Sequence, residues 1–311
     1  MRNYANQLPE PVRLKALTLG AIGTEWMSKL DQVVSELIDE WQIQIGDVMH
    51  GGSESLVLPA VCADEQLAIL KIGLPNTTTD LTNEAHVLRL ANGRGYTKLL
   101  AHNPAHNAIL VERLGASLAQ QTLPISQQIK IICTTLTKAW IPISAPNGLM
   151  TGAEKAKWLA AFIAQLWQEL DQPCSPHTIN KALAFTTERA DAYNPANCVL
   201  VHGDAHAHNT LQSPYAADQY QFIDPDGLFA EPAYDLAIPM REWGAELLAG
   251  DALRLGKIRC DLLSSLANVD PHAIWQWGFI ERVSTGLFLH HIGMNEIGTE
   301  YLAVADIWAR G

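Results

Sequence analysis

Apolar residues follow two different periodicities along this chain. In residues 26–41 they recur every three or four positions with charged residues between them, which predicts an amphipathic helix. Further on they form short runs broken by turn residues, which predicts strands. The predicted strands are a strand, glycine turn and strand over Gly46–Leu58, then Ala68–Ile72, Lys98–His102 and Ala108–Glu112. A helix over residues 80–93 is predicted to turn Glu84 inward, because Glu84 shares a face with Leu81 and Leu88.

Beyond Gly115 the pattern is mostly helical. Apolar residues recur at helical spacing over Trp158–Leu170, and Ser175-Pro176 and Asp270-Pro271 each combine a helix cap with a first-turn proline. Two short strands are predicted at Cys198–Val201 and Gln219–Ile223. We therefore expect an α+β protein with two domains joined by a hinge, an N-terminal lobe of residues 1–114 and a mainly helical C-terminal lobe of residues 115–311.

Composition narrows the class of protein. The chain has 311 residues, of which 48% are hydrophobic, enough for a large buried core. Its net charge of -12 argues against binding of nucleic acid, whose phosphates it would repel. The charge would attract a cationic small molecule as partner, or it serves only to keep the protein soluble. No apolar run is long enough to span a membrane, no signal peptide is evident, and five cysteines stand singly. We expect a cytoplasmic protein, and its oligomeric state stays open.

The most informative stretch is His202–Asn209, followed by Phe222–Gly227. It places Asp204 after an apolar strand, Asn209 five positions later, and Asp224 after a second apolar run. Phosphoryl transfer from ATP needs such a set. One carboxylate receives a hydroxyl proton, and an amide oxygen and a second carboxylate hold Mg²⁺. We predict Asp204 as the catalytic base and Asn209 and Asp224 as metal ligands.

Two neighbours are predicted to support this loop. His202 is expected to brace it, and Asp235, in the first turn of a helix that opens after Glu231-Pro232, is expected to accept hydrogen bonds from its backbone. His206 and His208 match no metal-ligand pattern with a third ligand nearby, so no zinc site is expected.

The N-terminal lobe offers partners for a nucleotide. Lys71 is a lone lysine in an apolar strand, where burial requires an anion unless the strand is an edge strand, and Glu84 is placed to pair with it. Kinases use such a pair to hold a lysine against the α- and β-phosphates. Gly52 and Ser53 either let the backbone approach phosphate or form a plain hairpin turn. The adenine ring is expected at the backbone near Glu112 and Leu114.

At these motifs the chain resembles a known family. Val201–Asn209, Ile223–Leu228 and Glu231–Asp235 are similar to the aminoglycoside phosphotransferases, and within them to the branch of streptomycin 6-kinases and hydroxyurea phosphotransferases. The resemblance extends from Trp41 to Leu287. It implies a protein-kinase-like two-lobed fold with a five-stranded antiparallel sheet in the N-terminal lobe, and it implies ATP and Mg²⁺ as cofactors. The loop departs from the usual family pattern at two places, Ala205 and Ala207-His208.

Three readings of function follow. The first is a kinase of a hydroxyl on an aminoglycoside of the streptomycin type, with Asp226, Glu231 and Glu281 as carboxylates for a cationic substrate, although Glu281 is equally well read as a solvated helix residue. The second is the same chemistry on a metabolite such as an amino alcohol or a sugar. The third, a catalytically silent nucleotide-binding protein, is disfavoured because Asp204, Asn209 and Asp224 are all present. A protein kinase is disfavoured because Glu231-Pro232 leaves no room for a long activation loop.

Overall fold

The computed structural model describes residues 3–52, 54–75 and 81–311. The chain forms two compact units, one of Met1–Gly115 with Ser213–Gln221 and the other of Ala116–Gln212 with Phe222–Gly311. The sequence-based division did not place the segment Ser213–Gln221 with the N-terminal residues.

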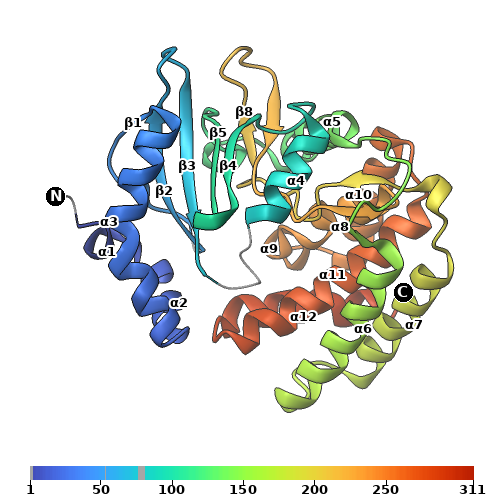
Figure 1. Cartoon of the computed structure of the whole chain (residues 1–311). Helices are drawn as coiled ribbons and strands as arrows, with labels where there is room; N and C mark the ends of the chain where they lie inside the picture. The colour runs from blue at the N-terminus through green and yellow to red at the C-terminus, as the bar shows by residue number, and fades with distance from the viewer. Residues whose placement is uncertain (1–2, 53, 76–80) are drawn as a thin grey trace. The chain divides into compact units, whose positions relative to one another are not determined.

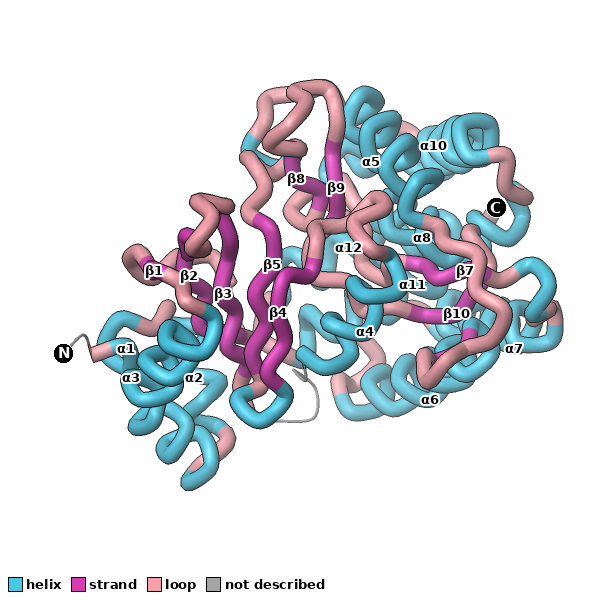
Figure 2. The backbone as a smooth tube through the Cα atoms, turned by 45° about the horizontal axis from the view of Figure 1, so that its top comes forward, coloured by secondary structure: helices cyan, strands magenta, loops and turns pink. Residues whose placement is uncertain are grey.

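The first unit contains the five-stranded antiparallel sheet that the family resemblance implied (Figure 2). Its strands are β1 (Gln44–Ile45), β2 (Ser55–Val61), β3 (Leu67–Gly73), β4 (Leu99–Asn103) and β5 (Ala108–Glu112). They lie in the order β1-β2-β3-β5-β4, and each neighbouring pair is antiparallel. Because β3 is the central strand, Lys71 on it lies inside the sheet, and the edge-strand alternative for this lysine is wrong.

The prediction of a strand at the start of Gly46–Leu58 is wrong in its position. The first strand is only Gln44–Ile45, and Gly46–His50 lies outside it. Two backbone contacts with β2 remain, from Gly46 N–H to the Pro59 carbonyl at 2.8 Å and from Met49 N–H to the Val57 carbonyl at 2.9 Å. These two isolated hydrogen bonds do not form the continuous pattern of a β-strand pair, so the chain between Gly46 and Met49 is irregular.

Three helices pack on this sheet, α1 (Tyr4–Gln7), α2 (Glu10–Thr18) and α3 (Ala21–Trp41), and are seen beside β1 and β2 in Figure 1. The predicted amphipathic helix is α3, which begins five residues earlier than its apolar stripe. Leu30, Val34 and Leu37 of α3 are fully buried in one core with leucines of β2 and β3. Helix α4 (Leu81–Ala91) follows β3 and turns Glu84 inward as predicted.

The second unit is mainly helical. Its helices are α5 (Ile125–Ala139), α6 (Gly152–Glu169), α7 (Pro176–Asp191), α8 (Ala233–Arg241), α9 (Gly244–Leu248), α10 (Ala252–Ala267), α11 (Pro271–His291) and α12 (Asn295–Trp308). Ser175 and Asp270 cap α7 and α11 as predicted. Helix α11 is buried over most of its length and packs against α6, α7, α8 and α12.

Short strands position the chemistry-bearing loops. Strand β7 (Val199–Val201) leads into His202, and the segment after Ile223 leads into β10 (Leu228–Ala230). These two strands pair antiparallel with Leu228 opposite Val201, and β6 (Met150–Thr151) lies parallel on the other side of β10. Since β7 ends where β10 begins, the two loops lie side by side. Strands β8 (Thr210–Gln212) and β9 (Tyr220–Phe222) form a separate hairpin between the loops.

None of the helices in the described ranges combines the length and the apolar character needed to cross a membrane.

Candidate active site

The loop that carries Asp204 is fixed by a buried carboxylate on α8. The Oδ2 atom of Asp235 accepts the backbone N–H of His202 at 2.9 Å, and Oδ1 accepts that of Gly203 at 2.8 Å. The indole N–H of Trp140 donates to Oδ2 at 2.9 Å, a partner that the sequence did not reveal. Burial raises the pKa of Asp235 to about 6, while these three donors oppose the shift by favouring the charged form. The contacts are those that a bracing role for Asp235 requires.

Replacing Asp235 by asparagine is expected to lower the free energy of unfolding by about 1–3 kcal/mol, because an amide nitrogen would face a buried N–H donor. Urea unfolding of the Asp235→Asn variant measures this loss. Asp261→Asn, at an exposed position of α10, makes the same chemical change without such contacts. Equal stability of the two variants would contradict the expectation.

Gly203 has a backbone conformation that only glycine accommodates here. Its φ is +92°, and a Cβ atom at this position would lie 2.8 Å from Cβ of Asp226 and 2.8 Å from Cδ1 of Leu228. The turn therefore brings the loop backbone against the neighbouring Asp224–Gly227 segment. The Gly227 N–H donates to the His202 carbonyl at 2.9 Å, which ties the two segments together.

His202 links the two loops through its ring. Its Nδ1 accepts the backbone N–H of Asp204 at 3.1 Å, so Nε2 carries the proton and donates to the Ile223 carbonyl at 2.9 Å. Complete burial lowers the pKa of His202, more than the nearby Asp204 raises it. A neutral imidazole that makes two hydrogen bonds fits the predicted bracing role of His202.

The two predicted metal ligands lie together. The Ile223 N–H donates to the Asn209 carbonyl at 3.0 Å, which brings Asp224 next to Asn209. The side-chain Nδ2 of Asn209 donates to the Asp204 backbone carbonyl at 3.1 Å, so the amide Oδ1 is the atom of this side chain that could bind a metal. Asp224 is solvent-exposed and has a φ of 56°, an uncommon conformation for a non-glycine residue. An amide oxygen and a carboxylate suit Mg²⁺, which prefers hard oxygen ligands. No cluster of three or more His, Cys, Asp or Glu residues suited to a metal occurs in the described residues.

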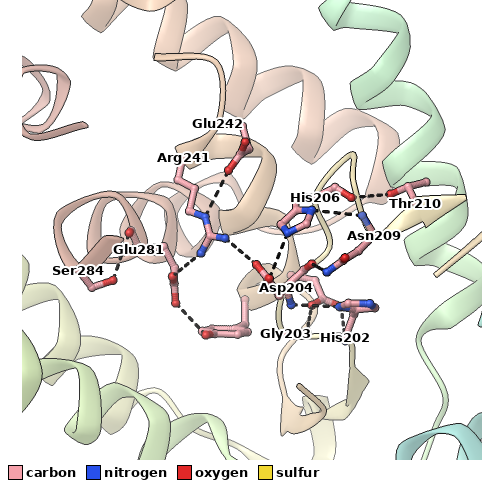
Figure 3. A network of polar contacts seen from close by, with 12 residues as sticks. His202, Gly203, Asp204, His206, Asn209, Thr210, Arg241, Glu242, Glu281 and Ser284 are labelled. Carbon is pink, nitrogen blue, oxygen red and sulfur yellow. Dashed lines mark hydrogen bonds and ion pairs between the residues drawn. The ribbon is translucent and has the colours of Figure 1, made fainter. Parts of the chain in front are cut away.

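Asp204 is held by Arg241 and His206 (Figure 3). Its Oδ1 accepts Nη2 of Arg241 at 2.6 Å, and its Oδ2 lies 3.3 Å from Nε2 of His206. Partial burial alone would raise the pKa of Asp204, but the hydrogen bond from His206 and the charge of Arg241 outweigh it, so its pKa lies well below the usual range. The side chain is 31% exposed and charged, and its second oxygen has only a long contact.

Arg241 connects Asp204 to Glu281. Its Nη1 donates to Oε2 of Glu281 at 3.1 Å, and Oε1 of Glu281 accepts the Tyr234 hydroxyl at 2.7 Å. Glu281 is 5% exposed, so its reading as a solvated helix residue is wrong. Both carboxylate oxygens of Glu281 have protein partners, which leaves this residue better suited to hold Arg241 than to bind a substrate.

The other two predicted substrate carboxylates, Glu231 and Asp226, have different surroundings. Oε1 of Glu231 accepts the Trp277 indole N–H at 2.9 Å and lies 3.3 Å from Nη1 of Arg189. Asp226 follows Asp224 in the same loop and has an exposed side chain. Desolvation by the surrounding protein and the charge of Asp204 raise the pKa of Asp226, and the nearby Lys155 lowers it.

Lys71 and Glu84 form a buried ion pair in the first unit. Nζ of Lys71 lies 2.6 Å from Oε2 of Glu84, and both side chains are 10% exposed. This is the pairing that the inward face of α4 predicted. Gly52 lies in the turn between β1 and β2, and Ser53 lies outside the described residues.

The predicted adenine contact is revised at Glu112. Its N–H donates to the Lys98 carbonyl at 2.8 Å and its carbonyl accepts the Thr97 hydroxyl at 2.8 Å, so its N–H is not available to a nucleotide. Its side chain accepts the Tyr215 hydroxyl at 2.5 Å. Leu114 is two residues further along, past the end of β5, where no strand in the described part of the chain accepts its N–H.

Sequence reasoning missed Arg241, His206 as a contact of Asp204, Tyr234 and Trp140. A signal existed for Arg241 alone. It ends α8, whose preceding residues Ala233–Met240 are all buried. A cation at the end of such a run requires an anionic partner.

The comparison with known protein families settles the family. The model of the aminoglycoside/hydroxyurea antibiotic resistance kinases matches residues 40–293. The chain belongs to this family. It is therefore a phosphotransferase that acts on small molecules, as the motifs around Asp204 and Asp224 predicted.

Relatives and solved structures agree with this assignment. The chain is 27% identical to the streptomycin 6-kinase of Streptomyces glaucescens over 285 residues, which cover 91% of this chain and 90% of that protein. The choline kinase LicA from Streptococcus pneumoniae has a similar fold, with a TM-score of 0.64 at 16% identity, covering 91% of this chain and 99% of that one. A spectinomycin phosphotransferase in complex with ADP and spectinomycin has a TM-score of 0.53 at 14% identity, covering 90% of this chain and 93% of that one. These likenesses confirm the kinase-like fold.

Proposed function

We propose that this protein transfers the γ-phosphoryl group of ATP to a hydroxyl group of an aminoglycoside of the streptomycin type. The observation that carries the proposal is the grouping of Asp204, Asn209 and Asp224 on two loops that Gly227 and His202 tie together. The relative named streptomycin 6-kinase supports the acceptor class.

In this reaction the acceptor hydroxyl oxygen bonds to the γ-phosphorus while the bond between that phosphorus and the β,γ-bridging oxygen breaks, and its electron pair leaves with ADP. Asp204 orients the hydroxyl and takes its proton. Its low basicity suits a loose transition state, in which the proton leaves late. Asp235 and His202 keep the loop in place throughout.

Asn209 and Asp224 would hold Mg²⁺, which when bound neutralises charge on the phosphate oxygens. Lys71, kept in place by Glu84, is assigned to the α- and β-phosphates, and the Leu114 N–H to the adenine ring. The spectinomycin phosphotransferase with bound ADP supports a nucleotide as donor.

A cationic acceptor agrees with the net charge of -12 and with the exposed Asp226. The second candidate is a kinase of a metabolite such as an amino alcohol or a sugar, and one observation favours a neutral acceptor, such as the sugar. Nζ of Lys155 lies 4.7 Å from the ring centre of Trp158 and 6.0 Å from that of Tyr234, and its charge already lowers the pKa of Asp226. A cationic acceptor would compete with Lys155 for the carboxylate of Asp226, whereas a neutral acceptor would not.

A coupled assay of ADP release from MgATP separates the candidates. The acceptors are streptomycin, other aminoglycosides, amino alcohols and sugars, and Asp204→Asn is the control for each. We expect a streptomycin-dependent rate that this substitution removes. Turnover with a metabolite and with no antibiotic would favour the second candidate, and failure to bind ATP would overturn both.

A further inference from the structure

Arg241 is the closest cation to the proposed base and is itself held in place from several directions. Besides Asp204 and Glu281, its Nε lies 3.5 Å from Oε1 of Glu242 (Figure 3). Its side chain is 14% exposed, so few of these contacts are open to competition by water. The hydrogen bonds from Nη1 to Glu281 and from Nη2 to Asp204 orient the planar guanidinium, and Glu242 adds a third negative charge beside it.

The backbone on both sides of Arg241 is also fixed. Nη2 of Arg282 donates to the Met240 carbonyl at 2.9 Å, and Nη1 of Arg259 donates to the Glu242 carbonyl at 2.6 Å. Arg282 is fully buried on α11, and its guanidinium lies 4.7 Å from the ring centre of Trp308. Hydrogen bonds from these two arginines secure the carbonyls that flank Arg241, so its guanidinium is pre-organised before any ligand binds.

This arrangement makes the two oxygens of Asp204 unequal. Oδ1 has a short bond of 2.6 Å to Arg241, whereas the contact of Oδ2 among the described residues is the longer one of 3.3 Å with His206. A carboxylate on a loop otherwise rotates about its side-chain bonds, and such rotation would expose either oxygen to the acceptor. Because Oδ1 has the short bond to Arg241 and Oδ2 the longer contact with His206, Oδ2 is the oxygen better able to accept a hydroxyl.

We propose that Arg241 is a positioning residue, which fixes the side chain of Asp204 so that Oδ2 meets the acceptor hydroxyl. The expected effect of Arg241 on catalysis rests on the proposed function. Its effect on the orientation of Asp204 rests only on the contacts of Arg241. Glu281 contributes to this positioning, because it binds Arg241 from the side opposite Asp204.

Kinetics of Arg241→Ala test the catalytic consequence. We expect kcat to fall about 10²-fold, as a misplaced catalytic group does, with KM for MgATP unchanged. Adding guanidinium at about 20 mM, far below the molar concentrations that unfold proteins, is expected to restore kcat at least tenfold. Arg241→Lys, which keeps a cation, is expected to lie between the wild type and Arg241→Ala.

The controls separate positioning from a loss of charge or packing. Arg254→Ala removes the same charge from an exposed position of α10 and is expected to keep the wild-type kcat with no response to guanidinium. Arg241→Ala combined with Asp204→Asn is expected to show no rescue. If Arg241→Ala folds poorly because Glu281 is left unpaired, the Arg241→Ala/Glu281→Gln variant removes that charge as well.

Crystal structures of the wild type and of Arg241→Ala test the inference without any acceptor. An Asp204 side chain that keeps its orientation in the variant would overturn the positioning role, even if the protein transfers phosphate to none of the acceptors tried. An unchanged or higher kcat in Arg241→Ala would also overturn it, as would a loss that neither guanidinium nor Arg241→Lys reverses. Absence of turnover in the wild type, with a displaced Asp204 in the variant, would instead refute the proposed function alone.

Discussion

Replacing Asp204 by asparagine is expected to lower kcat by about 10²–10⁴-fold, the range that general-base catalysis contributes. The amide cannot take up the hydroxyl proton. MgATP binding is expected to survive, because the predicted metal ligands, Asn209 and Asp224, are untouched. Steady-state kinetics with the acceptor that supports turnover give kcat, and calorimetry gives the dissociation constant for MgATP.

The Asp204→Asn substitution also changes the contact between residue 204 and Arg241. An amide at position 204 presents either an oxygen or an NH₂ group to a guanidinium that now has one anionic partner fewer. Asp261→Asn on the exposed face of α10 provides the matched control for an acid-to-amide change. Retention of more than a tenth of the wild-type kcat in Asp204→Asn would remove Asp204 from the role of base.

Replacing Lys71 by methionine is expected to lower the free energy of unfolding by about 3–5 kcal/mol, the typical cost of removing one member of a buried ion pair. Glu84 is 8% exposed and its bond to Lys71 is 2.6 Å long, so solvent does little to replace the lost charge. Unfolding by urea, followed by circular dichroism, measures the change.

A double substitution distinguishes the pair from the lysine itself. Lys71→Met with Glu84→Leu removes both charges and is expected to recover most of the lost stability, since apolar pairs replace buried ion pairs at little cost. MgATP binding is expected to stay weak in the double variant, because the phosphates still lack their lysine. A double variant that binds MgATP as tightly as the wild type would contradict the assignment of Lys71 to the phosphates.

Much of the first unit could be predicted because each element has a local signal. Alternating or continuous apolar runs bounded by turns mark β2 to β5, and the apolar stripe of α3 marks a helix that covers a sheet. The Lys71–Glu84 pair followed from a charge in an apolar strand and a charge on an inward helix face. The error over Gly46–Met49 arose because strand length depends on the partner strand, which a local pattern does not contain.

The network around Asp204 was less predictable, since it joins residues far apart in sequence. Arg241 follows Asp204 by 37 positions, and Glu281 follows Arg241 by 40. Helix α11 is buried on most sides, so its apolar pattern does not tell which neighbour Glu281 faces. Asp235 was easier, because a carboxylate in the first turn of a helix next to a tight loop has few roles other than accepting N–H groups.

Helix α8 touches the loop at two points, through Asp235 in its first turn and Arg241 at its last residue. Loop and helix are therefore expected to open together as one cooperative unit. In amide hydrogen exchange, the His202 and Gly203 amides would then share the opening free energy of the α8 interior, although they lie in an irregular segment. Amides in a loop usually exchange early, whereas here the slowest-exchanging amides of the second unit would include two in the loop that carries Asp204.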